Sequence, residues 1–181
     1  DIYSPQGKLL EFNMQEVTIP GRSTDTVRFT PFIYGTNANK WEPGAKNPPL
    51  YKVMLFTRRD GAYREYMPLK IGFGKTELVD GRLTRFDKEL KLVKAGYNAA
   101  ADRKTTLAEL KTLKAKGNNT ICPDYPQPGW FYDLCDELGL YVIDCANINA
   151  PEKRDDRKVG GTPSNDPSLA DEYLERVKAM Y

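Results

Sequence analysis

Residues 128–149 alternate apolar and polar positions in two successive patterns. After Pro128, apolar residues recur at helical spacing with acidic residues between them, which predicts a helix that ends at Gly139. The apolar run 140–143 follows at once and is typical of a strand buried on both faces of a parallel sheet. Polar residues then follow, among them Asp144, Asn147 and Asn149. A helix feeding a buried strand is half of a repeated strand–helix unit, and in barrels of such units the chemistry lies at the C-terminal ends of the strands.

The first 73 residues predict β-structure instead. Short runs rich in apolar and β-branched residues are separated by turn signals such as Pro20-Gly21. The predicted strands are 8–12, 16–19, 26–32, 50–57 and 62–71. The last two form a hairpin across Asp60-Gly61, a strong turn signal. Short strands at this spacing indicate part of an immunoglobulin-like sandwich.

Residues 74–181 change character. A second hairpin is predicted around Asp80-Gly81, and strands and helices then alternate. The predicted elements are strands 90–95, 119–122 and 140–144, and helices 105–116, 128–138 and 169–180. A polar loop over 153–167 contains the charge run 153–158, which we interpret as a solvated surface. The pattern predicts three strand–helix units.

Composition excludes several classes of chemistry. Histidine is absent, which excludes Ser-His-Asp, Cys-His and His-metal sites within this chain, and the three cysteines form no CxxC pair. The net charge of +2 indicates no strongly charged partner, and no apolar run approaches membrane length. We therefore expect no cofactor, no nucleic acid and no membrane, while the cellular compartment stays open. Residue 1 is Asp, so we expect a processed chain or a piece of a longer one.

Three segments resemble the family 2 glycoside hydrolases, above all the β-galactosidases. In this chain, WFYDLCDELGLYVIDCANI resembles the family's segment around the third barrel strand. Two earlier segments of this chain, NANKWEPGAKNPPLYKVMLFTRRDG and LKIGFGKTELVDGRL, also resemble segments of the family. The resemblance implies a mixed fold. Residues 1–73 would be a partial immunoglobulin-like β-sandwich that lacks its first strands. Residues 74–181 would be the first three βα units of a (β/α)8 TIM barrel.

The resemblance also implies a retaining enzyme that hydrolyses β-linked sugars. Such enzymes use two carboxyl groups about 5 Å apart. In this family two glutamates supply them from barrel strands 4 and 7, which would follow Tyr181. We therefore expect no catalytic residue in this chain, and a carbohydrate as its substrate.

The candidate substrate-binding residues are Asn98, Asp124, Asn147 and Asn149. Around them the chain departs from the family pattern. The family's GVNRHEH corresponds to residues 96–101, where three alanines replace its last members, and its RTSHYP corresponds to 121–126. The family's magnesium ligands, Glu and His, fall on Asn149 and Pro151, so we expect no metal.

Several alternatives stay open at this point. Asp124 either caps the turn before Pro126 or the helix at Pro128, or contacts a sugar hydroxyl. Asn147 and Asn149 hold the loop backbone or bind a ligand. Trp130 and Tyr132 offer a stacking platform, although helical spacing favours core packing for Trp130.

Two further alternatives concern the thiols and the function. Cys122 and Cys145 form either a disulfide or, as we favour, two buried thiols. The chain belongs either to an active glycosidase or to a carbohydrate-binding or scaffold relative that has lost catalysis. Open strand edges predict self-association, or contact with the rest of a parent chain, through apolar residues that include Leu92, Val93, Val142 and Ile143.

Overall fold

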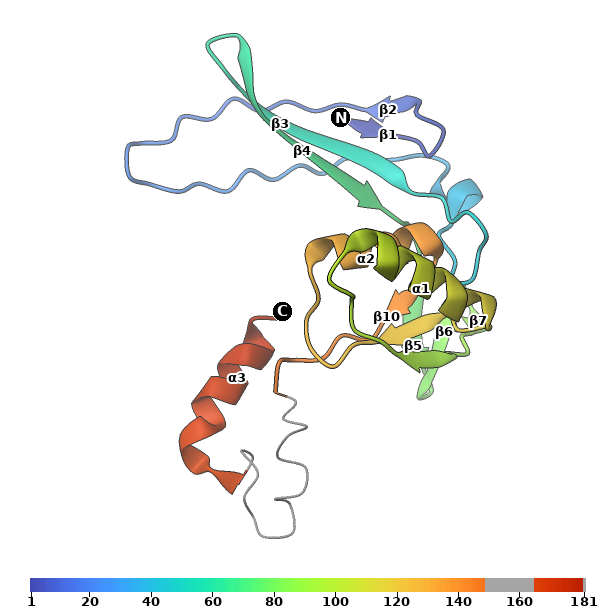
Figure 1. Cartoon of the computed structure of the whole chain (residues 1–181). Helices are drawn as coiled ribbons and strands as arrows, with labels where there is room; N and C mark the ends of the chain where they lie inside the picture. Colours follow the sequence, from blue (N-terminus) through green and yellow to red (C-terminus); the bar gives the residue numbers. More distant parts are fainter. Residues whose placement is uncertain (149–164, 181) are drawn as a thin grey trace. The chain divides into compact units, whose positions relative to one another are not determined.

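The computed structural model describes residues 1–148 and 165–180. It divides into two units, Asp1–Leu90 and Lys91–Tyr181. Figure 1 labels most of the strands and helices of these units.

The first unit contains a four-stranded antiparallel sheet in the order β2-β1-β3-β4. Its strands are β1 (Ile2–Tyr3), β2 (Leu9–Glu11), β3 (Tyr51–Arg59) and β4 (Ala62–Ile71). The long β3–β4 hairpin confirms the prediction from Asp60-Gly61. Both turn residues have positive φ angles, 54° and 77°, as a type I′ hairpin turn requires.

A second sheet in this unit has the order β5-β6-β7. Its strands are β5 (Thr76–Val79), β6 (Arg82–Arg85) and β7 (Lys88–Glu89), and the predicted turn at Asp80-Gly81 is confirmed. Trp41 and Tyr51 are buried in this unit. The Tyr51 ring meets the Phe73 ring edge-on, with 4.8 Å between the ring centroids. Packing requires glycine at position 72, because a Cβ there would lie 2.7 Å from Cγ of Trp41.

Residues 12–35 correct the sequence prediction. The strands expected at 16–19 and 26–32 do not form, and the strand expected at 8–12 is only β2. The segment runs as two extended arms (Figure 1), joined across by a hydrogen bond from Gln15 Nε2 to the Arg28 carbonyl. Its exposed apolar side chains include Phe12, Met14, Val17, Ile19, Val27, Phe29, Phe32 and Tyr34. The alternating pattern finds no sheet to pack on here, and a ribbon of two strands alone is marginal in water. The short 3₁₀ helix η1 (Thr36–Asn39) follows.

The second unit contains a parallel sheet in the order β10-β9-β8. Its elements are β8 (Lys94–Gly96), α1 (Arg103–Ala115), β9 (Thr120–Cys122), α2 (Gly129–Leu138), β10 (Tyr141–Val142), η4 (Pro167–Leu169) and α3 (Ala170–Lys178). Strands and helices therefore alternate as predicted up to β10. A buried cluster from α1, β9, α2 and the residue directly before β10 forms the core: Leu110, Ile121, Phe131, Leu134, Cys135 and Leu140.

Local signals explain the helix boundaries. Asp102 caps α1, since its carboxylate accepts hydrogen bonds from the amide (2.9 Å) and hydroxyl (2.7 Å) of Thr105. Gly139 ends α2 with φ 70°, and the Leu140 amide donates back to the Cys135 carbonyl at 2.8 Å. The helix therefore ends where the sequence predicts.

The first parallel strand begins later than predicted, at Lys94 instead of residue 90. The Asn119 side chain accepts from the Val93 amide (2.8 Å) and donates to the Lys91 carbonyl (2.8 Å). The Asn119 side chain thus occupies the Val93 amide and the Lys91 carbonyl, which would otherwise form hydrogen bonds with a neighbouring strand.

Candidate functional site

The C-terminal ends of β8 and β9 bring two of the predicted residues together. Asn98 Nδ2 donates to Asp124 Oδ2 at 3.0 Å, and the Asp124 amide donates to Asn98 Oδ1 at 2.9 Å. The parallel register aligns Gly96 with Cys122, so each of the two residues lies two positions beyond its strand. This reciprocal pair, which we call the Asn98–Asp124 pair, joins the two loops.

The start of α2 excludes one interpretation of Asp124, that of a helix cap. The N-cap of α2 is Pro128, and no side chain donates to or accepts from that helix start. Asp124 therefore does not cap the helix. Its carboxylate is exposed and accepts a single protein hydrogen bond from Asn98 in the described structure. The carboxylate keeps lone pairs that can accept hydrogen bonds from hydroxyl groups of a ligand.

Gln127 is a buried residue that the sequence did not single out. Its Oε1 accepts from the Ala99 amide at 2.7 Å, and its Nε2 donates to the Tyr125 carbonyl at 2.6 Å. One side chain thus connects the loop after β8 with the loop after β9, at the residues that directly follow Asn98 and Asp124. No sequence signal marks it, because its partners are backbone groups.

Tyr132 extends this network to the end of β10. Its hydroxyl donates to Asp144 Oδ2 at 2.6 Å and accepts from the Gln127 amide at 2.9 Å. Burial, and then the hydrogen bond to Asp144, raise the pKa of Tyr132 above its usual value. Three strand ends are therefore connected through Gln127, Tyr132 and Asp144.

The aromatic residues of α2 pack inward. Trp130 is partly buried against the core, as helical spacing favoured, and Tyr132 meets the Phe131 ring edge-on at 5.6 Å. The pair Trp130 and Tyr132 therefore does not form an exposed stacking platform.

The remaining candidates are not joined to the pair. Asn147 is exposed, and no hydrogen bond connects it with Asn98 or Asp124. Asn149, Pro151 and the charge run 153–158 lie outside the described residues. The structure thus unites two of the four candidate residues.

The cysteines correct a second prediction. All three are free, so Cys122 and Cys145 form no disulfide, as we favoured. They are not two buried thiols, however, because Cys122 is half-buried and Cys145 is exposed. Cys145 stands beyond the end of β10, past the part of the strand that packing covers. Cys135 is the buried thiol, and burial raises its pKa to about 12.

Neither a metal site nor a membrane span is found in the part of the chain that the structure describes. Among residues 1–148 and 165–180, no three His, Cys, Asp or Glu side chains gather as metal ligands would. No helix in the same ranges has the length and apolar character needed to cross a bilayer.

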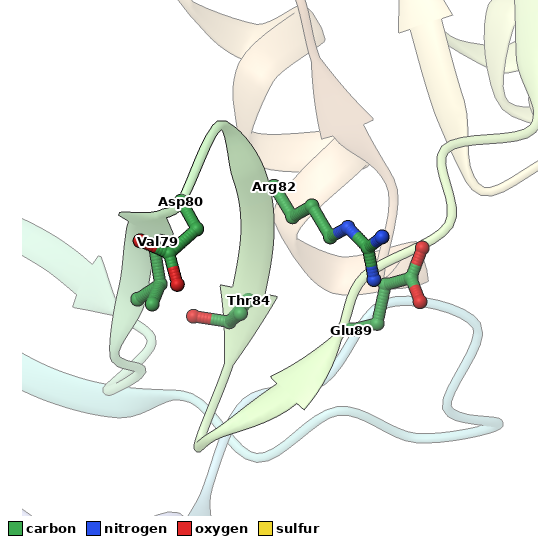
Figure 2. A pocket seen from close by; sticks show the side chains of 5 residues that line it. All are labelled: Val79, Asp80, Arg82, Thr84 and Glu89. Carbon is green, nitrogen blue, oxygen red and sulfur yellow. The ribbon is translucent and has the colours of Figure 1, made fainter.

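Figure 2 shows an open pocket in the first unit, on the sheet β5-β6-β7. It is lined by Val79, Asp80, Arg82, Thr84 and Glu89. None of the candidate residues contributes to it.

A family model and curated relatives match this chain. The model described as "Glycosyl hydrolases family 2, TIM barrel domain" matches residues 96–181. A β-galactosidase of Lactobacillus delbrueckii subsp. bulgaricus is 32% identical over 153 residues, which are 75% of this chain and 15% of that protein. A β-galactosidase of Pseudoalteromonas haloplanktis is 29% identical over 184 residues, 96% of this chain and 17% of that protein. The chain thus spans about a sixth of the length of these relatives.

Solved structures share the fold. A putative β-galactosidase from Bacteroides fragilis superposes with a TM-score of 0.69 at 22% identity, over 78% of this chain and 22% of that one. A β-glucuronidase from Parabacteroides merdae gives a TM-score of 0.62 at 24% identity, over 78% and 18% of the two chains.

Proposed function

Because the chain belongs to glycoside hydrolase family 2, we propose that it is part of an enzyme that hydrolyses β-linked sugars. The similar proteins are named β-galactosidase and β-glucuronidase, and enzymes with these names act on carbohydrates. The observation that supports a sugar-binding role for this segment is the Asn98–Asp124 pair at the C-terminal edge of the parallel sheet. In barrels of this kind the substrate binds at that edge.

The architecture that we propose follows the family. Residues 1–73 form part of an immunoglobulin-like sandwich, and residues 74–181 begin the TIM barrel with its first three βα units. The antiparallel sheets of the first unit support the former, and β8, β9 and β10 alternating with α1 and α2 support the latter. The boundary at residue 73 stays a prediction.

In this proposal the chain binds the sugar and does not break the glycosidic bond. The two glutamates of the retaining mechanism lie outside the chain. The Asp124 carboxylate accepts hydrogen bonds from sugar hydroxyls, while its bond from Asn98 keeps it oriented. Asn147 offers its amide group from the loop after β10, and Asn149, which lies outside the described residues, stays a candidate from the sequence. Gln127 and Tyr132 hold the loops in place.

A second candidate function is a carbohydrate-binding or scaffold relative without catalysis. It is favoured by the three alanines at residues 99–101, where the family resemblance expects His and Glu, and by Asn149 and Pro151 in place of metal ligands. The same departures favour a substrate other than a simple β-galactoside.

Hydrolysis assays test the proposal. Residues 1–181 alone should not hydrolyse aryl β-galactosides, β-glucuronides or β-mannosides, since the chain lacks both the general acid and the nucleophile. The full-length product of the gene should hydrolyse at least one of them. A full-length protein that binds these sugars without turnover would favour the non-catalytic relative. Turnover by residues 1–181, abolished by replacing one of their carboxylates, would contradict the proposal.

A further inference from the structure

The outer end of the β3–β4 hairpin carries an exposed cluster of three aromatic rings, which we call the ring cluster: Phe56, Tyr63 and Tyr66. The ring centroids of Tyr63 and Tyr66 are 5.5 Å apart, and Phe56 lies 5.1 Å from Tyr63 and 6.4 Å from Tyr66. The tyrosines are 51% and 61% exposed, so the cluster presents both rings to solvent.

A β-bulge creates this cluster. Tyr63 and Tyr66 are three positions apart, which in a regular strand places them on opposite faces. The register shifts between Thr57 and Arg58, however, so that Phe56 pairs with Tyr66 and Arg58 pairs with Tyr63. The extra residue turns Tyr63 onto the face of Tyr66, and bulges characteristically redirect side chains in this way.

The cluster lies on the more polar face of the hairpin. The opposite face is the apolar one, as its paired positions show: Tyr51 with Ile71, Val53 with Leu69, and Leu55 with Met67. A second layer of a sandwich would cover that apolar face. The ring cluster shares its own face with Lys52, Lys70 and Arg58, so packing within a sandwich does not account for three aromatic rings there.

The charges on this face are positive. Lys52 and Lys70 occupy opposite positions at one end, and the Arg58 guanidinium lies 5.2 Å from the Tyr63 ring at the other. The eight positions of β3 and β4 on this face hold no acidic residue. Asp1 adds one carboxylate opposite Met54, where it accepts a hydrogen bond from Tyr3. From Lys52 to Arg58 the row extends for about 20 Å, long enough for several sugar units.

We propose that this face binds an anionic oligosaccharide, one whose sugar units carry uronate or sulfate groups. The apolar faces of sugar rings stack on the tyrosine rings, while the tyrosine hydroxyls stay exposed to solvent and donate hydrogen bonds. The carboxylate or sulfate groups pair with Lys52 and Arg58. The proposal rests on the proposed function, because membership of a sugar-cleaving family selects a carbohydrate among polyanions.

Calorimetric titration of residues 1–181 with oligogalacturonate tests this. Binding is expected, and Tyr66→Ala and Tyr63→Ala should each weaken it by about fivefold or more, as the loss of an aromatic anchor does. Lys52→Gln should also weaken it while leaving the rings intact. Tyr34→Ala is the matched control, because Tyr34 is an exposed ring of the same unit outside the cluster and should not matter. Urea melts of all variants check that folding is unchanged.

Three results would overturn the proposal: no binding of oligogalacturonate, equal binding of a neutral cello-oligosaccharide, or binding of inorganic polyphosphate that is equally strong and insensitive to Tyr66→Ala. The last result would indicate a general polyanion surface, of the kind that nucleic acids use. The titration needs no catalysis, so its outcome is independent of whether the full-length protein hydrolyses glycosides.

Discussion

The Tyr132 hydroxyl joins two loops at the edge of the parallel sheet. It donates to Asp144 and accepts from the Gln127 amide, in partly buried surroundings. Tyr97 offers a natural comparison, since its hydroxyl also donates to a carboxylate, that of Glu109, and its ring also contacts Phe131. The two tyrosines differ in their amide contacts. The Gln127 amide donates to the Tyr132 hydroxyl, whereas the Ala100 amide near Tyr97 has the Thr106 hydroxyl as an acceptor at 3.0 Å.

Tyr132→Phe should therefore lower the free energy of unfolding of the second unit by about 1–3 kcal/mol, because it leaves a buried amide without its acceptor. Tyr97→Phe should change it by less. Urea denaturation followed by circular dichroism measures both. Equal effects of the two substitutions would show that the Gln127 contact contributes nothing.

Gly139→Ala should destabilise the second unit by about 1–2 kcal/mol, the penalty of placing a side chain in the left-handed region. Gly129→Ala is the matched control, because Gly129 lies within α2 in open space and does not have a positive φ angle. Thermal melting should separate the two variants clearly. A Gly139→Ala melt that matches the wild type would contradict the capping account.

The Asp102 cap predicts a dependence on pH. Hydrogen bonds from the Thr105 side chain and then its backbone hold the pKa of Asp102 below its usual 3.8. A lowered pKa in the folded state means that the stabilisation is complete above 3.8 and disappears as pH falls through the lower value. Asp102→Asn keeps a capping side chain but removes the charge. It should be less stable than wild type at pH 7, with the difference shrinking below pH 3.8 in parallel melts.

At the scale of elements, the sequence predicts what local signals decide. The turns at Asp60-Gly61 and Asp80-Gly81, and the end of α2 at Gly139, all require backbone conformations that few residues adopt. The prediction of strands at 16–19 and 26–32 was wrong, because alternating apolar residues specify a strand only where a neighbouring strand or sheet is present to pair with it.

The candidate site was predictable only in part, for a similar reason. The resemblance pointed to Asn98 and Asp124, and the parallel register then explains why they meet. Gln127 was missed because its hydrogen bonds are to the backbone of Ala99 and Tyr125, which leaves no residue pattern. Asn147 follows a strand of only two residues, and its loop continues into residues that the structure does not describe.

Helix α2 contributes most to the core of the second unit, through Phe131, Leu134 and Cys135. Phe131 is fully buried. Phe131→Ala should therefore cost about 3–5 kcal/mol, a loss that removes most of the stability of a small domain. Loss of dispersed amide resonances from the second unit in NMR spectra would confirm it. A variant that stays folded with an unchanged urea midpoint would show that the core lies elsewhere.

At the scale of the whole molecule, the open strand edges of the second unit determine how the chain is expected to associate. In the described residues β8 and β10 each pair only with β9, and Val93 and Ile143 beside them are 49% and 37% exposed. Exposed edges with apolar neighbours favour pairing with another chain. We predict that residues 1–181 self-associate or need further segments of a parent protein. Light scattering at low micromolar concentration tests this, and a monodisperse monomer of 20.5 kDa with a cooperative urea transition would contradict it.

The central claim is that the Asn98–Asp124 pair binds the sugar of a family 2 glycoside hydrolase. The most direct measurement is kcat/KM of the full-length gene product for its best aryl β-glycoside, with Asp124→Ala, Asn98→Ala and the exposed α2 control Asp133→Ala. We predict that kcat/KM falls by about tenfold or more in the first two variants, as loss of hydrogen bonds to a charged group implies, and stays within about twofold in the control. Unchanged kcat/KM in Asp124→Ala and Asn98→Ala would contradict the account.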